Sequence, residues 1–229
     1  MLFKDRTVAG QVLAKKLADY ANRSNVLVLA LPRGGVPVGF EVARALNAPL
    51  DVLVVRKLGV PHNEELAMGA LAKLPGTGFA SGGVRILNQS IVNDIQISDE
   101  VIARVAVQEE RELERRESMY RGDRPFPNLK GQTVILVDDG LATGATMWAA
   151  IIAVRQQQPK EIVIAVPVAA PETCDEMQSK VEKIVCANTP SPFYSVGMWY
   201  EKFPQTTDDE VRELLNKANN NHEPLLSGN

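Results

Sequence analysis

Five short runs of apolar residues, separated by segments of helical length, constrain the fold more than any other feature of this sequence. The runs are residues 26–31, 50–55, 133–137, 161–168 and 183–187. They are apolar almost throughout and do not alternate with polar residues, which is typical of parallel strands covered on both faces. Helices are predicted at 36–46, 145–157 and 171–181, and also at 5–20 and 208–217. The order predicts an α/β fold, a parallel sheet with helices on both faces and right-handed crossovers.

One interval between predicted strands is too long for a simple crossover, because roughly 75 residues separate the second run from the third. Its first part, 58–83, is rich in glycine and proline and is expected to include a mobile loop. Its second part predicts a helix capped by Ser98, whose charged continuation we interpret as a solvated face. We therefore expect one domain over 1–215, with a long helical insertion at about 58–132 and a disordered tail at 216–229.

Composition excludes several classes of function. The 229 residues are 45% hydrophobic, enough for one sizeable core, and the net charge of −3 creates no field that attracts nucleic acid or an anionic membrane. The first residues lack the apolar segment of a signal peptide, and no apolar run reaches the roughly 18 residues that span a bilayer. A soluble cytoplasmic protein is expected. Cys174 and Cys186 are too few for a disulfide framework, and we expect two thiols near the core.

The stretch VILVDDGLATGAT, residues 134–146, joins a predicted strand to two carboxylates and then to a loop of small residues. Small side chains allow the loop amides to approach a phosphate closely, and the helix that follows favours negative charge at its N-terminus. The carboxylates of Asp138 and Asp139 would repel that phosphate. They must therefore face sugar hydroxyls, a metal ion or a developing cation, so the implied ligand carries a phosphate and hydroxyl groups or Mg²⁺.

VILVDDGLATGAT resembles the phosphoribosyl diphosphate (PRPP) binding motif of the type I phosphoribosyltransferases, which have a Rossmann-like parallel-sheet core and a small hood. The resemblance implies that Asp138 and Asp139 hold the ribose hydroxyls, directly or through Mg²⁺ and its water. It implies a 5′-phosphate loop made of Ala142, Thr143, Gly144, Ala145 and Thr146.

Two further stretches extend this resemblance. The segment LALPRGGVPVG resembles the diphosphate loop of the family, with Arg33, Gly34 and Gly35 facing the leaving group. In VVRKLG, Arg56 and Lys57 stand where the family often keeps basic residues near the diphosphate. Catalysis would then rest on placement and electrostatics, with Mg²⁺ and these cations stabilising the departing diphosphate.

The sequence constrains the molecule that accepts the phosphoribosyl group less than it constrains the donor, PRPP. A C-terminal hood at about 188–206 contains Phe193, Trp199 and Tyr200, which we expect to stack against a base. The implied partners are PRPP and a small-molecule acceptor, and neither nucleic acid nor a membrane is expected. The reaction expected is transfer of the phosphoribosyl group to a nitrogenous base, a purine among the candidates. A PRPP- or nucleotide-sensing regulator and a transferase with a non-nucleobase acceptor remain alternatives, and the oligomeric state, including a homodimer, stays open.

Overall fold

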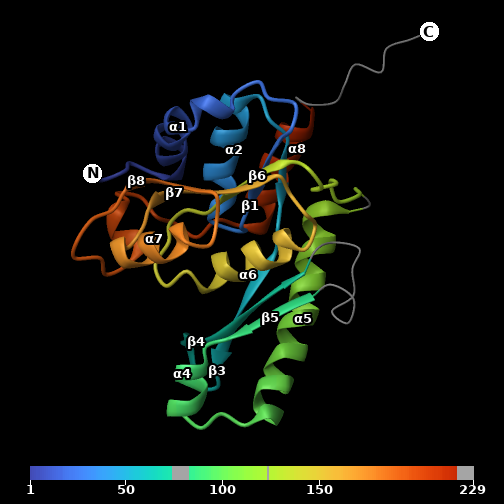
Figure 1. Cartoon of the computed structure of the whole chain (residues 1–229), viewed down its shortest axis with the longest axis vertical. Helices are drawn as coiled ribbons and strands as arrows, with labels where there is room; N and C mark the ends of the chain where they lie inside the picture. The colour runs from blue at the N-terminus through green and yellow to red at the C-terminus, as the bar shows by residue number, and fades with distance from the viewer. Residues whose placement is uncertain (74–82, 123, 221–229) are drawn as a thin grey trace. The chain divides into compact units, whose positions relative to one another are not determined.

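Two compact units make up the chain, and each contains its own sheet (Figure 1). The computed structural model describes residues 1–73, 83–122 and 124–220. The first unit comprises Met1–Val52, Leu129–Thr143 and Pro159–Asn229, and the second comprises Leu53–Asn128 and Gly144–Gln158. Among the described residues, no helix combines the length and the hydrophobicity that a bilayer crossing requires.

The sheet of the first unit has five parallel strands in the order β2-β1-β6-β7-β8. The strands are β1 (Val26–Ala30), β2 (Leu50–Val52), β6 (Thr133–Val137), β7 (Glu161–Val168) and β8 (Lys183–Asn188). Each arises from one of the five apolar runs, so the predicted parallel sheet is confirmed. The second run is longer than its strand, because β2 ends at Val52 and the residues after it belong to the second unit.

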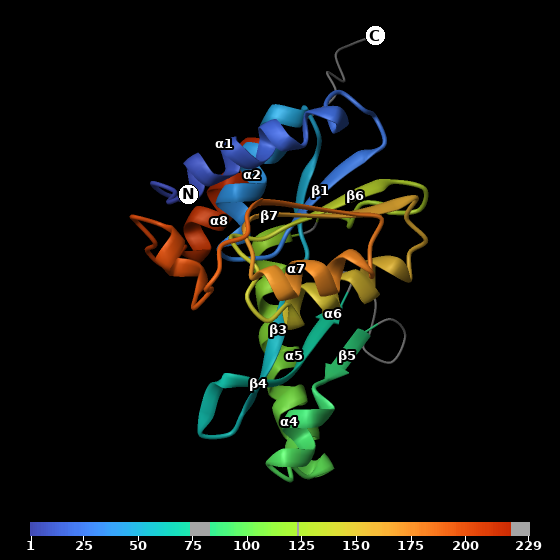
Figure 2. The ribbon, with the colours of Figure 1, turned by 60° about the vertical axis from the view of Figure 1, so that its left-hand side comes forward.

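Helices cover both faces of this sheet, with α1 and α2 on one face and α7 on the other (Figures 1 and 2). The helices of the first unit are α1 (Arg6–Lys16), α2 (Gly35–Leu46), α7 (Pro171–Gln178) and α8 (Asp208–Asn220). The Asp5 carboxylate caps α1 by accepting a hydrogen bond from the Val8 amide at 2.9 Å. The α-helix ends at Lys16, earlier than predicted, and a short 3₁₀ helix follows at Ala18–Tyr20.

A glycine allows α1 and α2 to pack backbone against backbone. A Cβ atom added to Gly10 would lie 2.8 Å from the Glu41 Cβ and 2.9 Å from the Val38 carbonyl oxygen. Beyond the far end of α1, the Tyr20 hydroxyl donates a hydrogen bond of 2.9 Å to the Glu161 carboxylate at the start of β7. Burial and this bond raise the pKa of Tyr20 to about 12, so the hydroxyl keeps its proton.

The described part of the second unit contains a three-stranded antiparallel sheet and three helices. Its elements are β3 (Val55–Val60), β4 (Asn63–Lys73), β5 (Gly83–Leu87), α4 (Gln89–Asp94), α5 (Asp99–Arg121) and α6 (Ala145–Arg155). The glycine- and proline-rich part of the interval is expected to include a loop, yet most of it forms β3 and β4. Burial of the Leu58, Met68 and Leu71 side chains stabilises these strands. Residues 74–82 of this part lie outside the described residues, so the expected mobile loop stays a prediction.

The predicted helix of the interval is α5. The Ser98 hydroxyl caps it by accepting a hydrogen bond of 3.4 Å from the Val101 amide. The charged continuation is exposed in part, with Arg116 paired to Glu112 at the predicted spacing, 2.7 Å apart. Arg121 departs from the expected solvated face: it is buried and its guanidinium lies 4.8 Å from the centre of the Phe126 ring.

A buried lysine joins α5 to β4. The Lys73 ammonium lies 3.0 Å from the Glu114 carboxylate and 3.9 Å from that of Glu117. Burial raises the pKa of Glu117 above its usual value of 4.5, although the Lys73 charge opposes the change. A carboxyl group with a raised folded-state pKa favours folding at low pH, and this contribution is lost as the pH rises through that pKa.

We therefore predict that Glu117→Gln raises the melting temperature at alkaline pH and that the gain shrinks toward acid pH. The reason is that Glu117 carries a buried negative charge once it loses its proton, and the glutamine side chain carries none at any pH. The measurement is thermal unfolding of both proteins between about pH 5 and pH 8. Glu114→Gln is the matched control, because it removes the shorter ion pair with Lys73 and should lower the melting temperature. A lower melting temperature for Glu117→Gln across the whole range would contradict this account.

Candidate functional site

Two loops of the first unit leave the sheet side by side. The strands β1 and β6 are parallel neighbours, and Ala30 at the end of β1 pairs with Val137 at the end of β6. The chain after β1 carries Arg33, and the chain after β6 carries the acidic pair. Because the carboxyl ends of parallel strands meet at one edge, the predicted diphosphate loop and the predicted ribose-binding pair lie together.

Two glycines make the close approach of these loops possible. A Cβ atom on Gly35 would lie 2.7 Å from the Val137 carbonyl oxygen and 2.9 Å from the Asp138 Cα. A Cβ on Gly34 would collide with the Asp139 carboxylate. The Gly35 amide already donates to the Leu31 carbonyl at 3.1 Å. Of the two predicted hydrogen-bond donors, the Gly34 amide is therefore the one better placed to bind an anionic ligand.

The acidic pair is ordered by its own backbone and by an arginine. The Asp139 amide donates a hydrogen bond of 2.8 Å to the Asp138 carboxylate. The Asp139 carboxylate accepts a hydrogen bond of 2.8 Å from the Nε of Arg6, and the two side chains are 16% and 11% exposed. Burial raises the pKa of Asp139, and the positive charge of Arg6 acts against that rise. The paired guanidinium thus favours the ionised carboxylate.

Arg6 also binds the C-terminal hood. Its Nη1 donates a hydrogen bond of 2.6 Å to the Pro204 carbonyl oxygen. Its guanidinium carbon lies 3.8 Å from the centre of the Phe203 ring, which is a cation–π contact. One side chain at the start of α1 therefore connects the acidic pair to the hood.

The predicted aromatic residues of the hood occupy different environments. Tyr200 is buried, its ring packs between Phe3 and Phe203, and its hydroxyl donates a hydrogen bond of 2.5 Å to the Asp139 carbonyl oxygen. Burial raises its pKa, with the Asp139 charge adding to the effect. Phe193 and Trp199 are only partly buried and pack against the same cluster. Base stacking stays a prediction, and these two rings are more accessible for it than Tyr200.

Arg33 lies in the loop after β1, and the peptide bond that precedes it is cis. Its guanidinium is 3.8 Å from the carboxylate of Asp208 at the first residue of α8, and both side chains are partly exposed. An exposed pair at this distance contributes little to stability, about 0–1 kcal/mol. The side chain can therefore exchange Asp208 for a ligand anion at small cost.

The residues of the predicted 5′-phosphate loop are divided between the two units. Ala142 and Thr143 are exposed and belong to the first unit. The Ala142 carbonyl accepts a hydrogen bond from the Thr173 hydroxyl, which ties this part of the loop to α7. Gly144 belongs to the second unit, where it precedes α6 with a φ of 73° that favours glycine. Ala145 and Thr146 form the first turn of α6, which has no side-chain cap.

The predicted basic pair belongs to β3 of the second unit. The Nε of Arg56 donates a hydrogen bond of 2.6 Å to the Glu109 carboxylate of α5, whereas Lys57 is exposed. Adjacent residues of a strand point to opposite faces of the sheet. Arg56 and Lys57 therefore face opposite sides of β3, and a diphosphate on one side of the strand would meet only one of them.

The carboxylates of Asp138 and Asp139 are hard oxygen ligands of the kind that Mg²⁺ prefers. In residues 1–73, 83–122 and 124–220, no cluster of three or more histidine, cysteine or acidic side chains has the geometry of a metal site. A magnesium ion at the acidic pair would therefore take most of its ligands from water and substrate oxygens, which is usual for Mg²⁺ bound with phosphates.

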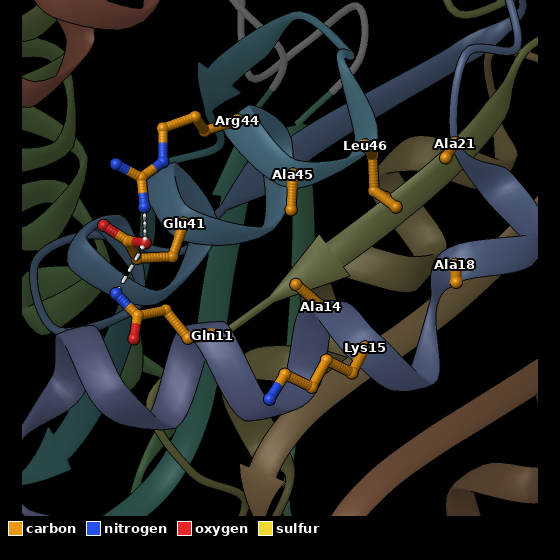
Figure 3. A pocket seen from close by; sticks show the side chains of 9 residues that line it. All are labelled: Gln11, Ala14, Lys15, Ala18, Ala21, Glu41, Arg44, Ala45 and Leu46. Atoms are coloured by element: carbon orange, nitrogen blue, oxygen red, sulfur yellow. Dashed lines mark hydrogen bonds and ion pairs between the residues drawn. The ribbon is translucent and has the colours of Figure 1, made fainter.

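A separate pocket lies between α1 and α2 and has a volume of about 310 Å³ (Figure 3). The buried Glu41 carboxylate at its rim accepts hydrogen bonds from Gln11, at 3.2 Å, and from Arg44. The remaining lining residues are mainly alanine and leucine. None of the predicted site residues lines this pocket, so it is distinct from the candidate site.

Sequence reasoning missed Arg6, Phe203 and Thr173. Arg6 and Asp139 are 133 residues apart, and an arginine in the first turn of a helix has no local feature that marks a role. No sequence feature marks Thr173 either, because its hydroxyl bonds to a backbone carbonyl, a group that every residue has. Only the tertiary structure reveals these residues.

Comparisons with known proteins identify the family of this chain. A family model described as phosphoribosyl transferase domain matches residues 6–197. A protein of Mycobacterium tuberculosis strain H37Rv, provisionally named a phosphoribosyl transferase, is 43% identical over 217 residues, which are 95% of this chain and 47% of the relative. An equally similar protein is found in strain CDC 1551 / Oshkosh. The chain thus spans about half the length of these relatives.

A solved structure supports the same assignment. The crystal structure of TT1426 from Thermus thermophilus is similar with a TM-score of 0.74 and 39% identity, covering 95% of this chain and 99% of that one. The family match spans most of the chain, and it includes the loops after β1 and β6. The chain therefore belongs to the phosphoribosyl transferase domain family.

Proposed function

We propose that this chain is a Mg²⁺-dependent phosphoribosyltransferase that transfers the 5-phosphoribosyl group of PRPP to a nitrogenous base and releases diphosphate. The observation that carries the proposal is the contact between the acidic pair and the glycine loop in the first unit. Gly34 and Gly35 are packed so closely against Asp138 and Asp139 that a Cβ on either glycine would clash. A ribose and its diphosphate need these two kinds of group within a few ångströms of each other.

The donor would be held at several points. Asp138 and Asp139 accept hydrogen bonds from the ribose hydroxyls, while Arg33 and the Gly34 amide face the diphosphate. Ala142, Thr143, Gly144, Ala145 and Thr146 hold the 5′-phosphate with backbone amides and two hydroxyls. Departure of the diphosphate leaves positive charge on the ribose ring, and the carboxylates beside the ring stabilise it. This chemistry needs positioned charges and no covalent intermediate with the protein.

The carboxylate oxygens of Asp138 and Asp139 are ligands that suit Mg²⁺. Asp138 and Asp139 would hold the ion, and when bound it would supply positive charge to the leaving diphosphate. Arg6 already compensates the Asp139 charge, so Asp138 is the better candidate for the closer contact.

Arg6 would act as a positioning residue. It does not reach the substrate in this scheme, but it fixes one oxygen of the Asp139 carboxylate and leaves the other for a ribose hydroxyl. Its contacts with Phe203 and Pro204 fix the hood relative to that carboxylate. Substrate binding at the acidic pair and acceptor binding at the hood would therefore depend on the same guanidinium.

The acceptor is proposed from the hood alone. Phe193 and Trp199 are partly accessible rings of the hood, and a planar nitrogenous base is the acceptor that such rings bind by stacking. Purines present the larger stacking surface and are the first bases to test. A cytoplasmic location is part of the proposal, and the oligomeric state stays open.

Phosphorus NMR of PRPP with Mg²⁺ and the protein tests the function. We expect diphosphate to be released only when a suitable base is added, from pools of purines, of pyrimidines and of nicotinate-type acceptors. A variant with both Asp138→Asn and Asp139→Asn is the control for contaminating enzymes. PRPP that binds and stays intact with every pool would contradict a base phosphoribosyltransferase and favour a regulator.

Single amide substitutions should separate the roles of the two carboxylates. Asp138→Asn should abolish turnover and leave the melting temperature unchanged, because the amide oxygen can still accept the Asp139 backbone hydrogen bond. Asp139→Asn should abolish turnover and also lower stability by about 1–3 kcal/mol, because it leaves the largely buried Arg6 without its counter-charge. Kinetics and thermal unfolding of both variants provide the measurement. Turnover near the wild-type rate in either variant would remove that carboxylate from the ribose site.

Arg6→Ala should raise the KM for PRPP about tenfold, because an unfixed Asp139 binds the ribose hydroxyls less well. Arg6→Lys keeps the charge but loses the planar guanidinium that bonds Asp139 and Pro204 together, so its KM should fall between those of the wild type and Arg6→Ala. Added guanidinium ion should partly restore Arg6→Ala, since it can occupy the vacated position beside Asp139. Steady-state kinetics with varied PRPP provide the measurement.

Arg212→Ala is the matched control for Arg6, because Arg212 forms an exposed ion pair with Asp209 at 2.5 Å on α8. It should leave KM and kcat unchanged. Equal KM values for Arg6→Ala and the wild type would mean that Arg6 serves the fold and not the site.

A further inference from the structure

The two cysteines lie in contact, although 12 positions separate them in the chain. Cys174 is in the middle of α7, and Cys186 is in β8, the edge strand of the five-stranded sheet. Their Sγ atoms are 2.7 Å apart, and both side chains are partly accessible to solvent. The two sulfur atoms need to move together by less than about 1 Å to reach the length of an S–S bond.

From this contact we infer that Cys174 and Cys186 form a redox-active dithiol, which a low-molecular-weight disulfide such as oxidised glutathione converts into an intrachain disulfide between α7 and β8. The inference is independent of the proposed function, because it uses no residue of the PRPP site and predicts a covalent change in the protein itself.

The chemistry is thiol–disulfide exchange. The Cys174 sulfur, after losing its proton to solvent, attacks one sulfur of oxidised glutathione, the glutathione S–S bond breaks and one glutathione thiolate leaves. Cys186 then loses its proton and attacks the Cys174 sulfur of the mixed disulfide, which releases the second glutathione thiolate. The protein has lost two electrons and two protons, and oxidised glutathione has been reduced to two thiols.

The order of the two steps follows from the environment of Cys186. Burial, and the hydrogen bond with Cys174, raise the pKa of the Cys186 thiol. It therefore keeps its proton in the reduced protein and is a poor first nucleophile. Once Cys174 carries glutathione, Cys186 is already beside the bond that must break, so the second step is intramolecular and fast.

Oxidation would act on the neighbourhood of the candidate site. Thr173 precedes Cys174, and its hydroxyl bonds to the Ala142 carbonyl. On the other side of the disulfide, β8 runs directly into the hood. A covalent link between α7 and β8 would restrict both segments, in addition to constraining the unfolded chain.

The test uses the full chain under native conditions. The protein is incubated with excess oxidised glutathione, the remaining thiols are alkylated, and intact mass and non-reducing electrophoresis are recorded. We expect a monomer that has lost two hydrogens, carries no alkyl group and no glutathione, and regains both thiols in dithiothreitol. Its melting temperature should exceed that of the reduced protein by several degrees.

Cys174→Ser and Cys186→Ser are the matched controls, because each retains one sulfur. Cys174→Ser should react slowly, and Cys186→Ser should accumulate the stable mixed disulfide that the wild type resolves. Two unreacted thiols in the wild type, a separate glutathione on each cysteine, or a disulfide-linked dimer would overturn the inference. An oxidised protein that melts at a lower temperature than the reduced one would contradict the proposed link between α7 and β8.

Discussion

The ion pair between Arg6 and Asp139 is the interaction on which the arrangement of the first unit depends. A guanidinium cannot lose its proton in a protein, so a largely buried arginine requires a nearby anion. Asp139 provides it beyond the end of β6, and Phe203 and Pro204 contact other parts of the same group. The start of α1, the end of a central strand and the hood are thereby fixed to one another by a single charge.

A second constraint is the absence of side chains at Gly34 and Gly35. The loop after β1 touches the acidic pair because nothing but hydrogen projects from these two residues toward it. The contact places the predicted diphosphate loop beside two carboxylates, which would repel a bound diphosphate without compensation. Arg6 supplies part of that compensation from the protein, and a substrate-bound cation would supply the rest. The proposed ligand site thus brings charges of opposite sign close together.

Most of the first unit is predictable from the sequence because its signals are local. Continuous apolar runs identify buried parallel strands, and the residues that follow β1 and β6 identify the loops of the site. The second unit is harder, because its strands β3 and β4 contain glycine and alanine among their apolar residues and so resemble loop. The role of Arg6 is not predictable, because its partners at Asp139 and Pro204 are more than a hundred residues away. Such contacts are a property of the folded chain and leave no periodic pattern.

The strand order has a consequence for how such a protein can diversify. β1 and β6 are neighbours in the sheet, yet almost the whole second unit is inserted in the chain between β2 and β6. The entropic penalty of lengthening an excursion between two paired strands grows only slowly with its length. Evolution can therefore enlarge, shorten or replace that excursion while the register of the central strands stays the same. The register of the central sheet and the length of the inserted segment can in this sense vary separately.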